Sequence, residues 1–369
     1  MRAAARHGRP GGADSPWHHR VRGALAVMPS ARGCPSSRGL LALIVVVAVV
    51  IVGGLAGAQS CAHRGDLDAL YCDEDRDLIA DPPKDPGRLL SPDPLIFTYV
   101  PVEDPAVYET AWSDFVKHLE KATGKKVKFF GLQNYAAQIE AMRSGRLHIA
   151  AYSTGSVVYA VNLAGAVPFA IMKDPKGLSG YHVWLIAAAK NDTIKTVADL
   201  RGKRVAHVSQ TSNSGHQAPV YFFSRMGVVP GKDYQIAYSG KHDTSALGVI
   251  NGDYDAAVVA DTVIQRMVAR NVFKTTDYKV VWTSPTFPTA GFVYAHNLEP
   301  KLVEKIKEAF FSFRFEGTSV GREFKPRIGF MPLAYARDWE PVLAVLKANG
   351  VTFTKESEEY KRLQKPSRE

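Results

Sequence analysis

The stretch Val205-Ala-His-Val-Ser-Gln-Thr-Ser-Asn-Ser-Gly-His-Gln-Ala-Pro219 decides how the rest of the chain is interpreted. Its first four residues predict a short buried strand, the next seven are hydroxyl, amide and glycine residues, and 216–226 predicts a helix. The first N–H groups of a helix lack intrahelical partners and its dipole favours negative charge there. The stretch therefore predicts an anion site, with the alternative that Ser212 or Ser214 only caps the helix.

A second loop of the same kind occurs earlier in the chain. The apolar run 147–151 predicts a strand, Tyr152-Ser-Thr-Gly-Ser156 follows it, and 157–163 predicts a helix. Ligand clefts of open α/β sheets lie beyond the carboxyl ends of strands, where both loops fall. We therefore expect Thr154 and Ser156 to donate hydrogen bonds to the same ligand as the first loop.

Strands and helices alternate from Pro94 onward, which is typical of an α/β fold. The pattern forms two units with a C-terminal return, so we expect two lobes, each an α/β sheet flanked by helices, with a ligand cleft between them. We assign 94–188 to lobe 1, 189–288 to lobe 2, and 289–369 to the return to lobe 1 and C-terminal helices.

The N-terminal region is different in kind. Residues 1–38 are rich in Arg, Gly, Pro and Ser, and 40–58 is an uncharged apolar run. Residues 1–60 therefore predict a signal peptide or a membrane anchor, and Met28 is an alternative start that would leave 1–27 untranslated. Both readings send the chain across a membrane, to the periplasm or the cell envelope. Cys61 is a candidate for lipidation and also for a disulfide with Cys72, and these two alternatives exclude each other.

The charge pattern excludes some classes of partner. The chain carries a formal net charge of +10, to which residues 1–60 contribute seven Arg and one Asp. No cluster of Lys and Arg interleaved with aromatics follows, so we expect no nucleic-acid partner. Residues 61–93 predict a polar linker, in which Asp73, Asp75, Asp77 and Asp81 resemble the start of a calcium loop. Leu78 replaces its glycine, so a solvated acidic segment is the favoured reading, and we expect no metal and no cofactor.

Several motifs together resemble the substrate-binding proteins of phosphate, phosphite and phosphonate ABC transporters, which have the type II periplasmic-binding-protein fold. The resemblance covers about 95–324. The residues that carry it include Val102-Glu-Asp-Pro105, Asn134-Tyr-Ala-Ala-Gln-Ile-Glu-Ala-Met-Arg-Ser-Gly145, Tyr152-Ser-Thr-Gly-Ser156, Gly180-Tyr181, Thr211-Ser-Asn-Ser-Gly215, Ser239-Gly-Lys-His242 and Ser284-Pro-Thr-Phe-Pro288.

The resemblance implies a set of ligand-binding side chains. It places Tyr135 and Tyr181 in the cleft, although a tyrosine taken alone is more often a packing residue. Ser212, Asn213 and Ser214 match the hydroxyl triplet of the family, with Asn213 where Thr is common, and His242 matches its ligand-contacting histidine. Asp261 falls within a residue or two of the acid that holds the substrate amine in aminophosphonate binders.

One departure from the family pattern bears on the ligand. Thr289, Ala290 and Gly291 follow Ser284-Pro-Thr-Phe-Pro288, where the family often has an acid. Without that carboxylate an ammonium group lacks a partner, so the prediction moves from 2-aminoethylphosphonate toward phosphite, phosphate or methylphosphonate. Neutral hydroxyls, amides and backbone N–H groups can hold such an oxyanion, so we expect no arginine counter-ion.

The resulting prediction is a monomeric solute-binding component of an ABC importer, which delivers a small phosphorus oxyanion to a membrane permease. The alternative is a protein of the same fold for another solute, such as a sulfonate, a thiamine precursor or another oxyanion. A periplasmic hydrolase is a further reading, because Ser214, His216, His242 and Asp243 are the ingredients of a Ser-His-Asp site. No Gly-x-Ser-x-Gly elbow is present, so we do not expect an enzyme.

Overall fold

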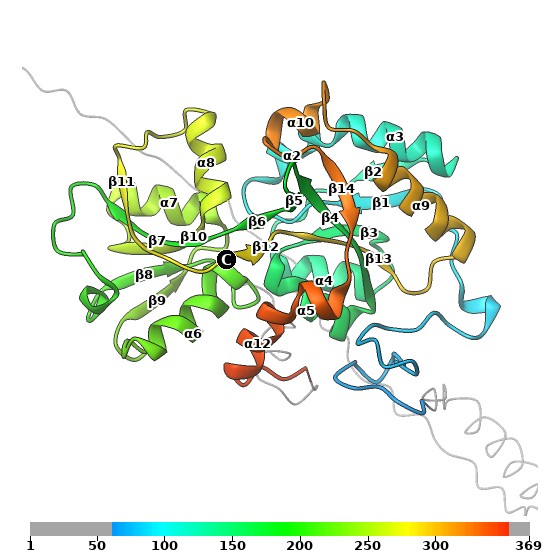
Figure 1. The fold of residues 1–369 in the computed structure, drawn as a ribbon, viewed down its shortest axis with the longest axis horizontal. Helices are drawn as coiled ribbons and strands as arrows, with labels where there is room; N and C mark the ends of the chain where they lie inside the picture. The colour runs from blue at the N-terminus through cyan, green and yellow to red at the C-terminus, as the bar shows by residue number, and fades with distance from the viewer. Residues whose placement is uncertain (1–60, 354–369) are drawn as a thin grey trace, which may run out of the picture. The chain divides into compact units, whose positions relative to one another are not determined.

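A computed structural model describes residues 61–353, and the predicted export segment 1–60 and residues 354–369 lie outside the described part. Two separate sheets, each flanked by helices, form two lobes (Figure 1). The predicted two-lobed α/β fold is confirmed. Within 61–353, no helix combines the length and the apolar character needed to cross a bilayer.

The sheet of lobe 1 combines parallel and antiparallel pairs, in the order β14-β4-β13-β3-β1-β2, with β5 paired to β4. Parallel pairing joins β1 to β2 and to β3, and β13 runs antiparallel between β3 and β4. Its strands are β1 (Leu95–Thr98), β2 (Val127–Phe129), β3 (Ile149–Tyr152), β4 (Ala166–Asp174), β5 (Gly177–Leu178), β13 (Gly291–Ala295) and β14 (Gly329–Pro332).

The sheet of lobe 2 has the order β11-β7-β10-β8-β9. Its strands are β7 (Val183–Ala188), β8 (Arg204–His207), β9 (Gln235–Tyr238), β10 (Ala256–Ala260) and β11 (Tyr278–Thr283). The chain passes between the lobes twice, and β6 (Gly180–Tyr181) and β12 (Phe287–Pro288) pair antiparallel at these two crossings.

The predicted lobe boundary at 188/189 lies too late. β7 pairs with β10 and β11 in lobe 2, so the chain has left lobe 1 by residue 183. An apolar strand shows by its composition that it is buried, and its partners in the sheet are fixed only by tertiary packing.

The helices cover both faces of each sheet. In Figure 1, α3 and α9 lie on one side of the lobe 1 sheet, and α4 and α5 lie on the other. The helices of lobe 1 are α2 (Pro105–Ala111), α3 (Ser113–Thr123), α4 (Tyr135–Arg143), α5 (Thr154–Ala164), α9 (Pro300–Ser312), α10 (Ser319–Glu323) and α11 (Tyr335–Asp338), and α12 (Glu340–Ala348) contacts α5 of lobe 1 and also α6 and η4. The helices of lobe 2 are α6 (Ala218–Arg225), α7 (His242–Asn251) and α8 (Asp261–Ala269). The short helical turns of the described chain are η2 (Pro86–Arg88) in the segment 61–93, and η3 (Val197–Leu200) and η4 (Asn213–Gln217) in lobe 2.

Two helical runs are interrupted. The run 105–123 is divided at Trp112, whose ψ of −1° separates α2 from α3. The Trp112 ring is fully buried and lies 5.3 Å from Phe97 and 5.5 Å from Phe115, so packing fixes the break. The helix expected from 216 begins instead with the π-helical turn η4, which Ser212 caps by accepting a hydrogen bond from Gly215 N–H.

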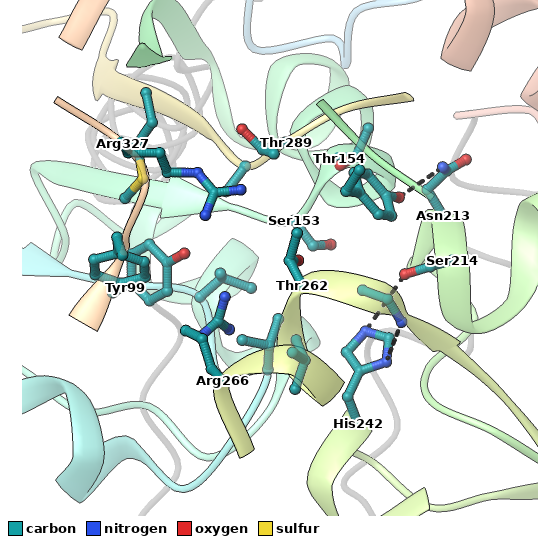
Figure 2. Close-up of a pocket in the computed structure, with 18 residues that line it drawn as sticks. Tyr99, Ser153, Thr154, Asn213, Ser214, His242, Thr262, Arg266, Thr289 and Arg327 are labelled. Carbon is teal, nitrogen blue, oxygen red and sulfur yellow. Dashed lines mark hydrogen bonds between the residues drawn. The ribbon is translucent and has the colours of Figure 1, made fainter. Parts of the chain in front are cut away.

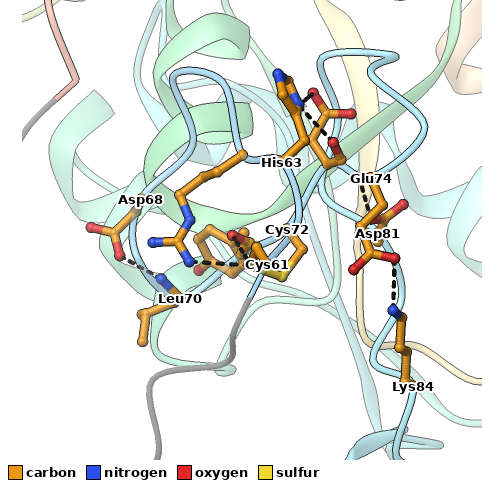
Figure 3. Close-up of a disulfide and its surroundings, with 11 residues drawn as sticks. Cys61, His63, Asp68, Leu70, Cys72, Glu74, Asp81 and Lys84 are labelled. Carbon is orange, nitrogen blue, oxygen red and sulfur yellow. Dashed lines mark hydrogen bonds and ion pairs between the residues drawn. A yellow bond between two sulfur atoms is a disulfide. The ribbon is translucent and has the colours of Figure 1, made fainter.

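Residues 61–93, predicted to be a polar linker, pack onto lobe 1 instead. Leu67 and Tyr71 are buried, and the Tyr71 ring lies edge-on to His296 at 4.9 Å. Asp68 N–H donates to Asn162 C=O at 2.8 Å. A disulfide joins Cys61 to Cys72 (Figure 3). The Cys61 sulfur is therefore not free to carry a lipid, and the lipid alternative is corrected to the disulfide.

Candidate functional site

A cavity lies at the junction of the two lobes. Its volume is about 60 Å³, counted as space open to the centre of a water-sized sphere. Its polar lining residues, drawn in Figure 2, are Tyr99, Ser153, Thr154, Tyr181, Asn213, Ser214, His242, Thr262, Arg266, Thr289 and Arg327. Among the described residues, this lining contains no carboxylate, and its charged groups are two guanidinium groups.

Four helix N-termini meet at this cavity. Ser153 and Thr154 begin α5, Asn213 and Ser214 begin η4, His242 begins α7, and Thr262 is the second residue of α8. Each of these helices follows a strand or a loop that ends at the same edge of its sheet. Unpaired N–H groups and helix dipoles in such positions favour a bound anion.

The two hydroxyl loops lie against each other across the lobe junction. A Cβ atom on Gly155 would lie 2.3 Å from Thr211 C=O and 2.8 Å from Asn213 N, so no side chain fits there. Ser156 Oγ lies 2.9 Å from Thr211 Oγ1, a hydrogen bond between the lobes. The predicted convergence of both loops is therefore present, and Gly155 makes the close approach possible.

The hydroxyl and amide groups on the cavity wall have defined partners. Thr154 Oγ1 donates to Pro288 C=O at 2.8 Å, and Asn213 Nδ2 donates to Tyr181 OH at 2.8 Å. Burial raises the pKa of the Tyr181 hydroxyl, which therefore stays protonated and keeps a donor. Thr289 Oγ1 is buried with no hydrogen-bond partner among the described residues. Its hydroxyl is therefore available to a ligand in the cavity.

His242 is held as a neutral donor. Its Nδ1 accepts a hydrogen bond from Ala260 N–H at 3.2 Å, so the ring proton lies on Nε2, which is 3.5 Å from Ser214 Oγ. Burial, assisted by the nearby charge of Arg266, lowers the pKa of His242 to about 3. The ring therefore offers an N–H to the cavity without a positive charge at neutral pH.

Some predicted site residues do not line the cavity. Ser156 makes the bond to Thr211, Ser212 caps η4, and the Tyr135 ring is buried at the start of α4. Asp261 is also absent from the wall, where its neighbour Thr262 stands instead. The Asp261 carboxylate accepts a hydrogen bond from Thr262 N–H at 2.6 Å, and burial raises the pKa of Asp261. Thr154, Tyr181, Asn213, Ser214 and His242 do line the cavity.

Arg266 and Arg327 are the main residues that sequence reasoning missed, and their place on the wall argues against the expectation of no arginine counter-ion. Figure 2 shows both guanidinium groups pointing toward the middle of the cavity. Arg327 Nε donates to Ser179 Oγ at 2.8 Å. Burial and the proximity of Arg266 lower the pKa of Arg327, as expected for two like charges in a dry site. An anion placed between them would relieve that repulsion.

The buried histidines predict a loss of stability in mild acid. Burial lowers the pKa of His242 to about 3 and of His296 to about 4, below the value of about 6.5 for an unfolded chain. Between these pKa values the unfolded state binds more protons than the folded state. The free energy of unfolding should therefore fall, as the pH is lowered from about 6.5, by up to about 1.4 kcal/mol per pH unit for each histidine. Urea unfolding at pH 7, 6 and 5 measures it, and His296→Asn should reduce the slope. Equal urea midpoints at pH 7 and 5 would contradict this expectation.

The fold and the interlobe cavity define a type II periplasmic binding protein. The family model described as ABC transporter, phosphonate, periplasmic substrate-binding protein matches residues 97–339, and the chain belongs to this family. Members of it are exported binding proteins.

Individual relatives support this family assignment. The chain is 33% identical over 231 residues to the phosphate-import protein PhnD of Mycolicibacterium smegmatis, covering 59% of this chain and 71% of the relative. It is 27% identical to the phosphonates-binding periplasmic protein of Escherichia coli, covering 73% of this chain and 82% of the relative. A binding protein component of an ABC phosphonate transporter from Pseudomonas aeruginosa has a TM-score of 0.63 at 23% identity, over 73% of this chain and 93% of its own. At that identity the structural likeness supports the fold alone.

Proposed function

We propose that this protein captures a small phosphorus oxyanion, in the size range of phosphate, phosphite and methylphosphonate, and delivers it to the permease of an ABC importer. The observation that carries the proposal is the cavity wall, which combines two guanidinium groups, four helix N-termini and several hydroxyls, with no carboxylate among the described residues. Cationic and polar donors without a carboxylate favour an anion with several acceptor oxygens.

The cavity volume sets the size of the ligand. The cavity, with about 60 Å³ open to sphere centres, has room for several waters, since about 10–15 Å³ of occupied volume holds one. A phosphorus atom with four substituents fills a comparable space. The bound oxyanion would lose its hydration shell, and each donor would count for more in that dry site.

The charges on the wall argue against an aminophosphonate. An ammonium group in the cavity would lie near Arg266 and Arg327, and Asp261 does not reach the wall. The names of two relatives point the same way: one imports phosphate in M. smegmatis, and another, 23% identical over 56% of this chain and 71% of the relative, is a probable phosphite-binding protein of Prochlorococcus marinus. We therefore infer that 2-aminoethylphosphonate binds more weakly than methylphosphonate.

Calorimetric titration with phosphate, phosphite, methylphosphonate, 2-aminoethylphosphonate and sulfate tests this function. We expect saturable binding of a phosphorus oxyanion, weakened about 10- to 150-fold by Ser214→Ala, because a hydrogen bond to a charged group contributes about 1.5–3 kcal/mol. Ser224→Ala on the exposed side of α6 is the matched control and should bind as the native protein does. No heat with any phosphorus compound would reject the proposal and favour another solute, such as a sulfonate or a thiamine precursor.

The geometry does not favour the hydrolase reading. A Ser-His pair needs an unprotonated Nε2 facing the serine, whereas the hydrogen bond from Ala260 N–H to Nδ1 leaves the proton on Nε2. Asp243 does not orient this ring, since its Oδ2 accepts from Asp104 N–H at 3.0 Å. We infer that the protein binds its ligand without chemical change. Turnover of p-nitrophenyl phosphate lost in Ser214→Ala would contradict this.

The remaining parts of the function concern export and delivery. We infer that residues 1–60 direct export to the periplasm or hold the chain at the membrane, and that the protein acts as a monomer. A disulfide between Cys61 and Cys72 fits an oxidising compartment outside the cytoplasm.

A further inference from the structure

The segment 61–93 contains a cluster of carboxylates that the binding function does not use. Asp73, Asp75 and Asp77 each place a carboxylate oxygen so that the three atoms lie within 4.8 Å of one another. The cluster is not part of the oxyanion cavity, whose wall contains none of these residues. Like charges this close repel unless a cation lies among them.

The surroundings of the Asp73 carboxylate also point to a bound cation. Its side chain is fully buried, and neither carboxylate oxygen accepts a hydrogen bond from the described residues. The His63 ring lies beside it, with Nδ1 2.8 Å from Asp73 C=O and 3.6 Å from Oδ2. A buried carboxylate without hydrogen bonds is costly, and a bound ion is one of the few explanations for it.

The spacing of the acids identifies the ion. Asp73, Asp75, Asp77 and Asp81 stand at the first, third, fifth and ninth positions of a calcium-binding loop, and Ile79 C=O stands at the seventh. The sixth position of such loops is a glycine in a sharp turn, and Leu78 adopts that turn here with φ of +72°. Hard oxygen ligands at this spacing suit Ca²⁺ rather than a transition metal.

We propose that the loop 73–81 binds one Ca²⁺ ion through Asp73, Asp75 and Asp77. The twelfth position, which usually supplies a bidentate Glu, is Lys84, and its Nζ pairs with Glu74 at 2.6 Å. The site therefore lacks the strongest ligand of such loops, and we expect a Kd of about 10⁻⁴–10⁻³ M, as in extracellular modules.

The position of the loop indicates what the ion does. The Cys61–Cys72 disulfide ends one residue before Asp73, and Asp75, Asp77 and Asp81 border a cavity that is also lined by Tyr294 of β13 and Val303 of α9. Figure 3 shows His63, Glu74 and Asp81 close to the disulfide. Calcium would therefore hold the segment 61–93 against lobe 1, and its loss would loosen this segment without changing the oxyanion site.

Calorimetric titration with CaCl₂, after removal of calcium by a chelator, tests the proposal. We expect one saturable site, and a higher melting temperature in about 5 mM Ca²⁺ than in chelator, with a much smaller response to Mg²⁺. Asp75→Asn, at an exposed position, should weaken binding at least about tenfold. Asp66→Asn removes the same charge from an exposed position of the same segment and should bind Ca²⁺ as the native protein does.

Asp73→Asn should change the melting temperature differently in chelator and in Ca²⁺. In chelator this variant should melt at a higher temperature than the native protein, because it removes a buried charge that no hydrogen bond from the described residues satisfies. In Ca²⁺ it should show no further increase. Absence of binding heat, or an equal loss of binding in Asp66→Asn and Asp75→Asn, would overturn the proposal.

Discussion

Replacing Gly155 by valine should weaken oxyanion binding by about 5- to 150-fold, the equivalent of about 1–3 kcal/mol. Even a single Cβ atom at this position would lie 2.3 Å from Thr211 C=O, and the clash is with backbone, which cannot rotate away. Gly155 belongs to lobe 1 and Thr211 to lobe 2, so the lobes must separate to admit the side chain. A ligand that contacts both lobes then binds a geometry that is less populated.

Two measurements distinguish this mechanism from a general loss of structure. Calorimetry should show the lower affinity, and small-angle X-ray scattering should show that the ligand-saturated variant has a larger radius of gyration than the native complex. Gly87→Ala is a suitable control, because a Cβ there meets only the flexible Asp85 side chain, at 3.3 Å. A valine variant with native affinity would mean that binding does not need this contact between the lobes.

The sequence predicted best those features that have a local signature. Small hydroxyl residues between a strand and a helix identified both loops, and Thr154, Asn213 and Ser214 do line the cavity. The same signature cannot say which hydroxyl serves the ligand. Ser156 and Ser212 have the same local pattern, but one bonds across the lobes and the other caps η4.

The two arginines had no local signature. Arg266 lies inside the amphipathic α8, where a basic residue is ordinarily on a solvated face, and Arg327 lies in the turn before β14. Both reach the cavity because the sheets bring segments from distant parts of the chain together, as β13 and β14 flank β4. Contacts set by tertiary packing are the part of the site that periodicity and motifs leave undetermined.

The second large effect is expected at Glu103, which joins the lobes beside the cavity. This buried residue of lobe 1 accepts hydrogen bonds from Arg266 Nη2 at 2.9 Å and from Tyr108 OH at 2.8 Å. Its other carboxylate oxygen pairs with Arg270 Nη2, so Arg266 of α8 and Arg270, the C-cap of α8, converge on one acid. Arg270 Nη1 also pairs with Glu323 of lobe 1 at 2.5 Å.

Glu103→Ala should therefore weaken ligand binding by about 3 kcal/mol, or roughly 150-fold, because removing one partner of a buried ion pair leaves the other charge without compensation. The free energy of binding should change more than the free energy of unfolding, because Arg266 and Arg270 regain contact with water when the lobes separate. Calorimetry measures the affinity and urea unfolding measures the stability. Glu109→Ala, at an exposed position of α2, is the matched control.

A double-mutant cycle with Arg270 separates the ion pair from other effects of the alanine. Arg270 does not line the cavity, so Arg270→Ala should act on binding only through the contact with Glu103 and Glu323. If the pair holds the lobes together, the double variant should bind more tightly than the sum of the single losses predicts, by about 0.5–3 kcal/mol. Strict additivity would mean that Glu103 acts on the ligand through Arg266 alone, because that contact survives the loss of Arg270.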